Sequence, residues 1–338
     1  MNGRDSKEDK EEHEQVMSEV HLGCPPGIFG PHISRFTICL PSGVESSRFN
    51  GLFKDQEPCT DQNISFDEDG DLVLPRRRQI SRRCFTMKIQ HNITSSIPSV
   101  GLQVWKAELV LSDFVLHKIC TSMEFHGIVS LELGAGTGLA GMLLALAART
   151  VFLTDHGDKI LENCLKNVQL NYGVLKHRNV IYVRELDWTH PWPPKDSSDH
   201  ASQERFTWSS FELEEVQKAS LLLAADVIYS DYLTDALFGI LERIMSQGSE
   251  KVLYLALEKR YNFSLDDLDI VANGYSKFRS YTKEDSECEG LEPGSLPCFM
   301  GRCIDIAEIP QYVGGYDRGK DVELWEIRYN KDTALMPC

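Results

Sequence analysis

The segment Glu132-Leu-Gly-Ala-Gly-Thr-Gly138 places one acid and three alternating glycines directly after a short apolar run. Glycines allow the backbone to turn sharply and to approach a ligand closely. The apolar segment that follows, from Leu139 to about Arg149, is predicted to be a helix whose first N–H groups could bind a carboxylate or phosphate. The pattern indicates a cradle for a nucleotide-containing cofactor between a strand and a helix.

Two cofactor classes fit this cradle. The spacing Gly136-x-Gly138-x-x-Gly141 is the dinucleotide fingerprint, whereas Glu132-x-Gly134-x-Gly136-x-Gly138 is the pattern of S-adenosylmethionine (SAM) sites. At the carboxyl end of the strand, Glu132 could bind the ammonium of the methionine moiety, directly or through water. Because a pyrophosphate gains nothing from a neighbouring carboxylate, Glu132 favours SAM. A strand-to-helix turn without any ligand is the third alternative.

A second acid supports an adenosine-containing cofactor. Asp155 ends the next predicted strand about 20 residues after Gly134, the usual spacing for an acid that accepts both ribose hydroxyls. Its alternative role is to cap the helix predicted over 158–170. Since Asp158 is better placed for capping, we expect Asp155 to be free for the ribose.

Asp187 and Trp188 follow the third predicted strand, where an adenine would lie. An indole can sandwich a purine, and an acid or a backbone group can accept its amino hydrogen. Tryptophan is, however, more often a core residue than a ligand contact. The position of Trp188 beyond a strand end leaves both alternatives open.

Asp226 and Tyr229 follow the fourth predicted strand, Leu221–Ala225, where the reactive methyl group of SAM would point. Strand alternation alone puts them on opposite faces, so both can serve one site only if the chain turns after Asp226. An acid at the tip of a dry strand needs a partner or a role. Positioning a cationic or amine substrate is such a role.

The spacing of apolar segments predicts the elements that position these residues. Strand and helix patterns alternate from about Val100, which is typical of a Rossmann-like α/β sheet with helices on both faces. Ligands then bind at the carboxyl ends of the first strands. The predicted strands are 128–133, 150–154, 180–184, 221–225, 251–257 and 322–328, with a further candidate at 276–281, and the predicted helices are 104–120, 139–149, 158–170, 232–246 and 264–273.

Composition limits the class of protein. The formal net charge of −16 argues against directly bound nucleic acid and fits a basic protein partner, although acidity commonly serves only solubility. No run of about 18 apolar residues occurs, and the first ten residues carry charge where a signal peptide would have an apolar segment, so we expect an intracellular protein without a membrane segment. The 10 cysteines form no C-x-x-C pair, so we expect reduced thiols and no metal site.

Several segments resemble one known family, the methyltransferase-like 21 group of seven-strand, SAM-dependent protein-lysine methyltransferases. They are Gly101-x-x-Val-Trp105, Leu131–Gly138, Asp155, Glu185-Leu-Asp-Trp188 and Ala225-Asp-Val-Ile-Tyr229, and the match spans about residues 90–330. Three further blocks resemble one branch of this group more closely than its siblings: Asp67–Leu72, Glu258–Asp269 and Glu323–Trp325.

The resemblance implies a class I methyltransferase fold and a lysine side chain as methyl acceptor. It implies nuclear and cytoplasmic clients that include chaperones and, for that branch, a nuclear nucleic-acid-binding protein. Asp226 and Tyr229 would mark the active site. The cofactor contacts implied by matching, together with Glu132 and Asp187 from the preceding reasoning, are Trp105, Glu132, Gly134, Gly136, Thr137, Gly138, Asp155, Asp187, Trp188 and Ala225.

We therefore expect two parts: residues 1–85 as a partly disordered acidic N-terminal extension, and residues 86–338 as the SAM-dependent methyltransferase domain. A piece such as 85–93 could form strands that pack onto the main domain. The extension carries a basic patch, Arg76–Arg78 with Arg82 and Arg83, which fits an import signal, a surface for acidic partners or an exposed loop. Two long connections, 189–219 and 283–316, could shape substrate access or be surface insertions.

The expected function is methyl transfer from SAM to a lysine of a folded protein client by a monomer. One alternative is methylation of a small molecule or of another protein nitrogen, such as that of arginine or histidine. The other is a non-catalytic SAM-fold module that binds a client or chaperone. A nucleic-acid amino-methyltransferase would favour an Asn/Asp-Pro-Pro-aromatic turn where this chain has Asp226-Val-Ile-Tyr229, and no metal-hydrolase or triad motif occurs.

Overall fold

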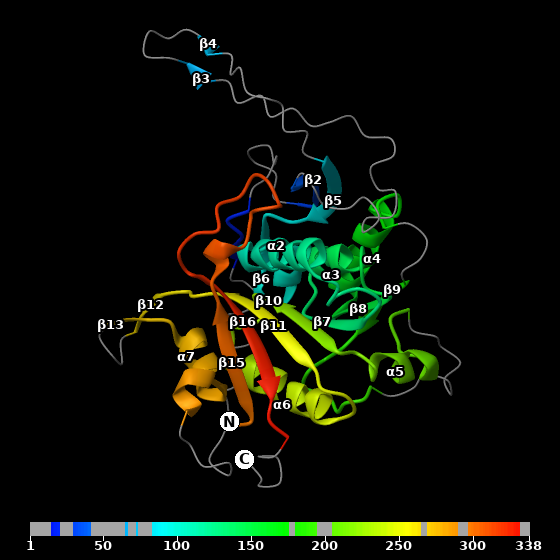
Figure 1. The fold of residues 1–338 in the computed structure, drawn as a ribbon, viewed down its shortest axis with the longest axis vertical. Helices are drawn as coiled ribbons and strands as arrows, with labels where there is room; N and C mark the ends of the chain where they lie inside the picture. The colour runs from blue at the N-terminus through cyan, green and yellow to red at the C-terminus, as the bar shows by residue number, and fades with distance from the viewer. Residues whose placement is uncertain are drawn as a thin grey trace, which may run out of the picture.

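The centre of the molecule is an eight-stranded sheet with helices on both faces (Figure 1). The computed structural model describes residues 15–20, 30–41, 65–66, 72–73, 83–175, 180–194, 205–264, 269–289 and 297–331. The sheet order is β14-β15-β16-β11-β10-β7-β8-β9. Its strands are β7 (Val129–Leu133), β8 (Thr150–Asp155), β9 (Val180–Glu185), β10 (Leu221–Ala225), β11 (Val252–Glu258), β14 (Thr282–Glu284), β15 (Phe299–Ile304) and β16 (Val322–Tyr329).

The strand directions create a switch point between β7 and β10. Strands β9, β8, β7, β10 and β11 are parallel neighbours, while β16 runs antiparallel to both β11 and β15. From β7 the chain adds β8 and β9 on one side and β10 and β11 on the other, so a crevice opens at the carboxyl ends of β7 and β10. The predicted α/β class is confirmed, and β14 adds a short edge strand.

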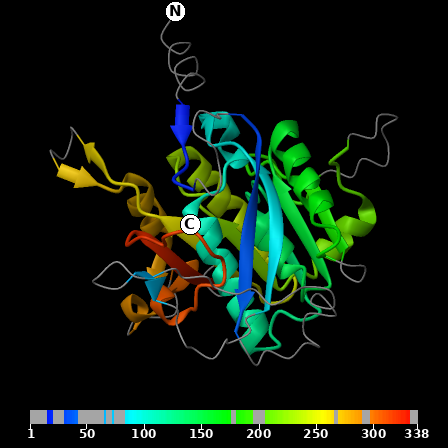
Figure 2. The ribbon, with the colours of Figure 1, turned by 90° about the horizontal axis from the view of Figure 1, so that it is seen from above.

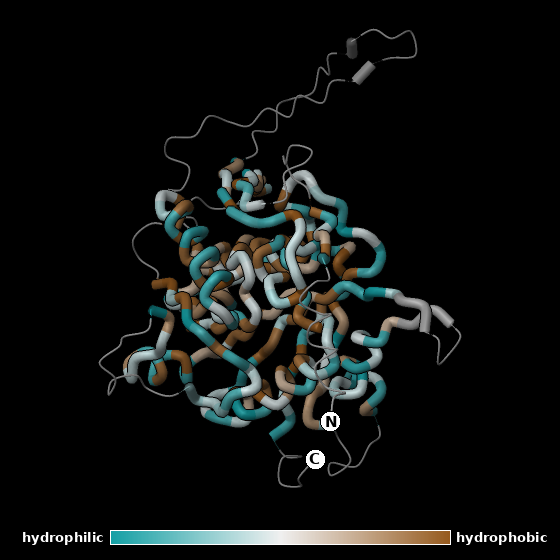
Figure 3. Tube along the Cα trace, turned by 180° about the vertical axis from the view of Figure 1, so that it is seen from behind, coloured by the Kyte–Doolittle hydropathy of each residue, from teal (hydrophilic) through white to brown (hydrophobic). Residues whose placement is uncertain are grey.

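Helices cover both faces of the sheet. On one face lie α2 (Lys106–Thr121), α3 (Leu139–Leu144) and α4 (Asp158–Leu170), and on the other lie α5 (Ser210–Val216), α6 (Asp231–Ser246) and α7 (Asn273–Tyr281) (Figure 1). Successive strand residues therefore enter different cores: Val151 and Leu153 belong to one cluster and Phe152 to the other. Hydrophobic segments accordingly gather in the middle of the molecule (Figure 3).

Part of the amino-terminal region, which was expected to be a partly disordered extension, contributes to this core. Strand β2 (His32–Leu40) pairs antiparallel with β5 (Arg83–His91), and the two lie side by side (Figure 2). In β2, every second side chain from Phe36 to Leu40 is buried, as the period of a strand requires. The boundary expected after residue 85 therefore falls inside β5. Strand β1 (Gln15–Met17) pairs with β6 (Thr94–Ser96).

The β2–β5 ladder also corrects the expectation of reduced cysteines. Cys39 and Cys84 lie opposite each other in the register and form a disulfide. Cys164 and Cys288 are free and buried, as expected of most thiols. The basic patch, apart from Arg83, lies outside the described residues, as do residues 67–71. Two short strands, β3 (Ser65–Phe66) and β4 (Leu72–Val73), pair with each other.

Four predicted segments differ from the structure. The candidate strand 276–281 lies within helix α7, where Phe278 packs between Phe238 and Trp325. The predicted helix 264–273 contains β13 (Asp269–Val271), which pairs with β12 (Asn262–Ser264), and residues 265–268 lie outside the described part. Connection 283–316 contains β15, and α3 ends at Leu144 instead of about 149. Helix α5, by contrast, lies in connection 189–219 where a Glu-rich piece indicates a helix. Short aromatic and apolar segments carry no period long enough to distinguish a strand from a helix.

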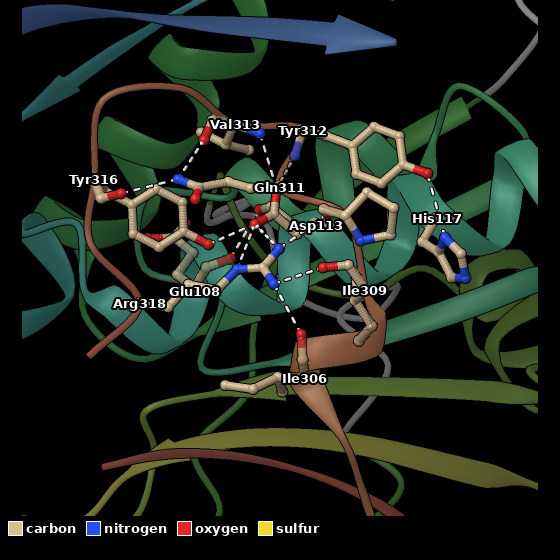
Figure 4. A network of polar contacts seen from close by, with 12 residues as sticks. Glu108, Asp113, His117, Ile306, Ile309, Gln311, Tyr312, Val313, Tyr316 and Arg318 are labelled. Atoms are coloured by element: carbon tan, nitrogen blue, oxygen red, sulfur yellow. Dashed lines mark hydrogen bonds and ion pairs between the residues drawn. The ribbon is translucent and has the colours of Figure 1, made fainter. Parts of the chain in front are cut away.

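The segment from Ile309 to Gly319, here called the strap, joins β15 to β16 and fastens β2 to α2. Tyr312 and Thr37 provide carbonyl oxygens to the N–H groups of Cys39 and Gly314. Asp113 of α2 binds the strap from inside, with the Arg318 guanidinium beside it (Figure 4). Helix α2 is consequently covered on both sides, which explains why its apolar residues surround it.

Three short 3-10 helices complete the described elements: η2 (Ile97–Leu102), η3 (Asp285–Cys288) and η5 (Ile306–Glu308). Segment η2 leads directly into α2 and contributes to the crevice described below. Among the described residues, no helix is long and apolar enough to cross a membrane. Within the same residues, no group of three or more His, Cys, Asp or Glu side chains could hold a metal ion.

Candidate functional site

A cavity of about 280 Å³ lies at the switch point of the sheet. The carboxyl ends of β7, β8 and β10 form its floor, and η2 and the start of α2 form its rim. Ten of the predicted site residues line it: Trp105, Glu132, Gly134, Gly136, Asp155, Asp187, Trp188, Ala225, Asp226 and Tyr229. The structure thus gathers residues from five segments that are distant in the sequence.

The glycine turn has the conformation that the pattern predicts. Gly134 and Gly136 have φ angles of 64° and 51°, in the left-handed region that favours glycine. A Cβ on Gly134 would lie 2.6 Å from Cγ1 of Val227, and one on Gly136 would lie 3.0 Å from the carbonyl oxygen of Gly101. Both glycines are therefore needed for the close approach of this turn to η2 and to the end of β10.

Thr137 and Gly138 are not among the residues that line the cavity, and their predicted contact with the cofactor stays a prediction. Thr137 is fully buried, and its hydroxyl donates to Oε1 of Glu108 at 2.6 Å. Gly138 is the N-cap of α3, where a Cβ would lie 2.8 Å from Sγ of Cys164. Gly134 to Gly136 line the cavity, whereas Thr137 and Gly138 pack against α2 and α4, so these two residues shape the turn.

Glu108 is a cavity residue that the sequence analysis missed. It sits in the first turn of α2, is buried, and accepts hydrogen bonds from Thr137 and from the Leu139 N–H at 3.1 Å. Burial raises its pKa to about 7, although these hydrogen bonds oppose the shift. The available signal was an acid near the start of the predicted helix 104–120, which the structure places three positions after the N-cap Trp105, as in a capping box.

Glu132 lines the cavity, as expected, but its described contact is with the protein. Its Oε2 accepts the N–H of Gly141 at 2.9 Å, which ties the end of β7 to α3. Burial and the neighbouring charge of Glu108 raise its pKa well above the usual range. The predicted contact with a methionine ammonium stays a prediction.

Asp155 braces the glycine turn instead of capping α4. Its two oxygens accept the N–H groups of Gly136 and His156, each at 2.8 Å. The N-cap of α4 is Gly157, so the alternative capping role does not apply to Asp155. Burial raises the pKa of this carboxyl above its ordinary value, and the hydrogen bonds from Gly136 and His156 oppose that shift.

Trp188 and Asp187 form the wall next to Asp155. The indole of Trp188 packs on the turn, with Cζ2 3.3 Å from where a Cβ of Gly134 would lie. Its Nε1 is buried and has no hydrogen-bond partner in the part of the chain that the structure describes. Asp187 accepts both the N–H and the hydroxyl of Thr189, at 2.9 and 2.7 Å. Burial acts to raise the pKa of Asp187, but these hydrogen bonds outweigh it and lower the pKa.

The chain turns at Asp226, as the joint use of Asp226 and Tyr229 required. Asp226 has a φ angle of 57°, and its N–H donates to the carbonyl oxygen of Ala256 at 2.8 Å. This backbone conformation brings both side chains to the cavity. Burial, together with the charges of Asp155 and Asp226, raises the pKa of Tyr229 to about 12, so its hydroxyl stays protonated at neutral pH.

Arg260, which lies beside the cavity residue Asp226, is a second residue that the sequence analysis did not single out. Its Nη2 forms an ion pair with Oδ2 of Asp226, whose side chain is almost completely buried. The other oxygen of Asp226, Oδ1, is also buried and has no partner among the described residues. The sequence signals were a basic pair, Lys259-Arg260, after the fifth strand of the predicted succession, and the place of Arg260 in the block Glu258–Asp269.

Comparisons with known proteins agree with this geometry. Residues 85–203 match the family model described as lysine methyltransferase. Methyltransferase-like protein 22 of Mus musculus is 35% identical over 277 residues, which cover 80% of this chain and 67% of that protein. Its Homo sapiens counterpart is 36% identical over 244 residues, which cover 71% of this chain and 57% of that protein.

A third relative belongs to the group whose motifs this chain resembles. The protein N-lysine methyltransferase METTL21A of Xenopus tropicalis is 30% identical over 177 residues, covering 51% of this chain and 67% of that protein. The resemblance stated from the sequence motifs is therefore confirmed, including its closer branch, methyltransferase-like protein 22. This chain spans about two thirds of the mouse relative and less of the human one.

Proposed function

This chain belongs to the lysine methyltransferase family, a group of SAM-dependent enzymes, and we propose that its cavity brings SAM together with a lysine of a basic protein client. The observation that carries the proposal is the joining of two sets of residues in one cavity. The glycine turn, Asp155 and Trp188 form a nucleoside cradle, and Asp226 with Tyr229 stands at its acceptor end.

The cavity residues fit SAM chemically. SAM carries a sulfonium and an ammonium, and five acids line this cavity: Glu108, Glu132, Asp155, Asp187 and Asp226. For the first three, burial raises the pKa, which is the cost of a carboxylate without enough countercharge. A cationic ligand supplies that countercharge, and the buried indole N–H of Trp188 offers it an unused donor.

When bound, SAM supplies an activated methyl group on a positively charged sulfur. In the transfer, the lysine nitrogen would form a new bond to that carbon as the sulfur–carbon bond breaks, and the positive charge would move to the nitrogen. Asp226 would bind the acceptor amine and guide its departing proton, and the protonated Tyr229 would form a wall of the lysine channel. The protein residues mainly orient the reactants and exclude water.

The client proposed here is a basic protein of the nucleus or cytoplasm, such as a nucleic-acid-binding protein or a chaperone. The formal net charge of −16 favours a basic partner and disfavours direct nucleic-acid binding. The family resemblance supports the client classes and both compartments. We further propose that the chain acts as a monomer.

Labelling of a cell extract with tritiated SAM tests this proposal. The purified chain should label a small set of proteins, and mass spectrometry should place the methyl groups on lysine. Label on arginine, histidine or a small molecule would support the alternative acceptors. Binding of SAM without any transfer would favour a non-catalytic client-binding module. The Asp226→Asn variant is the control for contaminating methyltransferases.

A further inference from the structure

Arg260 lies between two residues that line the cavity. It follows β11, donates to Asp226 at one side, and places its guanidinium 5.0 Å from the ring centroid of Trp105 at the other. Trp105 is itself held by the donation of its indole N–H to the carbonyl oxygen of Val100 at 3.1 Å. The guanidinium is thus seated on a fixed aromatic face and against a buried carboxylate.

Asp226 on its own would oppose the reaction that it serves. The acceptor lysine must be neutral to attack, yet its reference pKa is about 10.4. A carboxylate within about 4–6 Å favours the charged ammonium and raises that pKa further, the more so in a buried site. A lone Asp226 would bind the lysine tightly in the form that cannot react.

We propose that Arg260 is a positioning residue that shares Asp226 with the acceptor lysine. It holds the carboxylate through Oδ2 and leaves Oδ1, which is unpaired among the described residues, for the amine. Its positive charge also offsets the pull of Asp226 on the ammonium, so the bound lysine loses its proton more readily. This inference rests on the proposed lysine methyl transfer.

The other charged groups around the pair do not replace Arg260. Burial alone would lower the pKa of Arg260, but the charge of Asp226 and, more weakly, those of Glu258 and Glu19 raise it. The nearby Lys106 is bound to Glu258 at 2.6 Å and to Glu19. On the cavity side, Glu108 of α2, Asp155 of β8 and Tyr229 bring acidic or phenolic groups. His156 also lines the cavity, but its Nδ1 lies 3.2 Å from an oxygen of Glu185 and 3.9 Å from one of Asp187, so it is engaged by two other carboxylates.

The pH dependence of kcat at saturating SAM and client peptide tests this role, since it reports pKa values in the complex. For Arg260→Gln we expect the acidic limb of the pH profile of kcat to shift by about one unit toward higher pH, so that kcat at pH 7 falls about tenfold. Arg260→Lys keeps the charge and should keep the wild-type limb with a smaller loss of kcat. SAM affinity, measured by calorimetry, should stay within about twofold in both variants, because Arg260 is not among the cavity-lining residues.

Lys259→Gln is the matched control. It removes one positive charge from the adjacent position, where Lys259 pairs with Glu323 and lies over the ring of Tyr275, and it should leave the limb unchanged. Thermal unfolding reports whether each variant folds. If Arg260→Gln does not fold, Arg260→Met keeps a long side chain over Trp105 and takes its place.

A folded, uncharged variant with the wild-type limb and kcat would overturn the inference. A lower KM for the client with unchanged kcat would also overturn it, because Arg260 would then only compete with the lysine. If the wild-type chain binds SAM but methylates no lysine, the proposed function fails, and the role of Arg260 fails with it. These outcomes are distinguishable, since the first two require an active wild-type enzyme.

Discussion

Buried carboxyl groups have different roles in two regions of this molecule, the strap and the cavity. Asp113, fully buried under the strap, accepts hydrogen bonds from two backbone N–H groups, a tyrosine hydroxyl and the guanidinium of Arg318 (Figure 4). The acids of the cavity have fewer partners, and Oδ1 of Asp226 has none among the described residues. The chain therefore satisfies Asp113 internally for stability and leaves the cavity acids to be satisfied by a ligand.

The largest effect should follow from removing Asp113. Asp113→Ala leaves Arg318, only 16% exposed, and two strap N–H groups without their partner. Breaking one side of a buried pair costs about 3–5 kcal/mol of unfolding free energy. Denaturant unfolding measures this loss. An unfolding free energy equal to that of the wild type would show that Asp113 does not stabilise the fold.

Asp155→Ala should lower the affinity for SAM, whereas Asp113→Ala should lower the stability of the fold. If Asp155 accepts the ribose hydroxyls, its loss should weaken SAM binding by about 1.5–3 kcal/mol, the range for hydrogen bonds to a charged group. Calorimetric titration with SAM measures this change. Asp113→Asn, assayed below its unfolding temperature, is the control and should bind SAM like the wild type. Unchanged affinity in Asp155→Ala would disprove the ribose role.

Glu108 should make SAM affinity depend on pH. Its pKa is raised to about 7 by burial, and a cationic ligand favours its ionised form, so affinity should fall about tenfold per pH unit below 7. Titrations at pH 6 and pH 8 measure this, and Glu108→Gln should abolish the difference. Equal affinity of the wild type at both pH values would show that Glu108 does not couple to the ligand.

Without ligand, the same carboxyl has the opposite effect on folding. Its folded pKa exceeds its ordinary value of 4.5, so the folded chain holds more protons than the unfolded chain between about pH 4.5 and about pH 7. Its stabilising contribution is fully present below that window and is lost as the pH rises through it. Glu108→Gln should therefore unfold at higher denaturant than the wild type at pH 8, the reverse of the Asp113 variants.

The smallest effect should come from the amino-terminal segment at the cavity rim. The Ser18 N–H donates to Oε1 of Gln103 at 2.6 Å, and Nε2 of Gln103 donates to the carbonyl oxygen of Val16 at 3.1 Å. Gln103 lines the cavity. Deleting residues 1–20 should weaken SAM binding about threefold to tenfold, the loss of one or two hydrogen bonds. A deletion variant that is folded and binds SAM with wild-type affinity would separate this segment from the site.

Local sequence patterns were enough to predict the cradle. Contacts between residues that are distant in the sequence could not be predicted from such patterns. The glycine turn, Asp155 and the tip at Asp226 were found because each follows an apolar strand at a spacing that the chemistry requires. The strap was missed because Asp113 meets Tyr312 and Arg318 about 200 residues later in the chain, which no local period encodes. Arg260 was missed for the same reason, since its role depends on pairing with a different strand end.

The amino-terminal strands show the same limit. Buried and exposed side chains alternate clearly along β2. Only the pairing of β2 with β5, which lies more than 40 residues later in the chain, makes β2 part of the core. Segments such as 276–281 failed for another reason. Aromatic side chains have an intrinsic preference for strands, so the sequence favoured a strand. In the structure, the packing of Phe278 against Phe238 and Trp325 stabilises a helix instead.

The central claim is that the Asp226 end of the cavity carries methyl transfer while the glycine and Asp155 end holds SAM. The most direct test compares Asp226→Ala with the wild type in two assays on one preparation: calorimetric SAM binding and transfer of tritium to client lysine. We expect SAM affinity within about threefold of the wild type and a loss of transfer of at least about 100-fold. Full retained transfer by a folded Asp226→Ala protein would contradict the account.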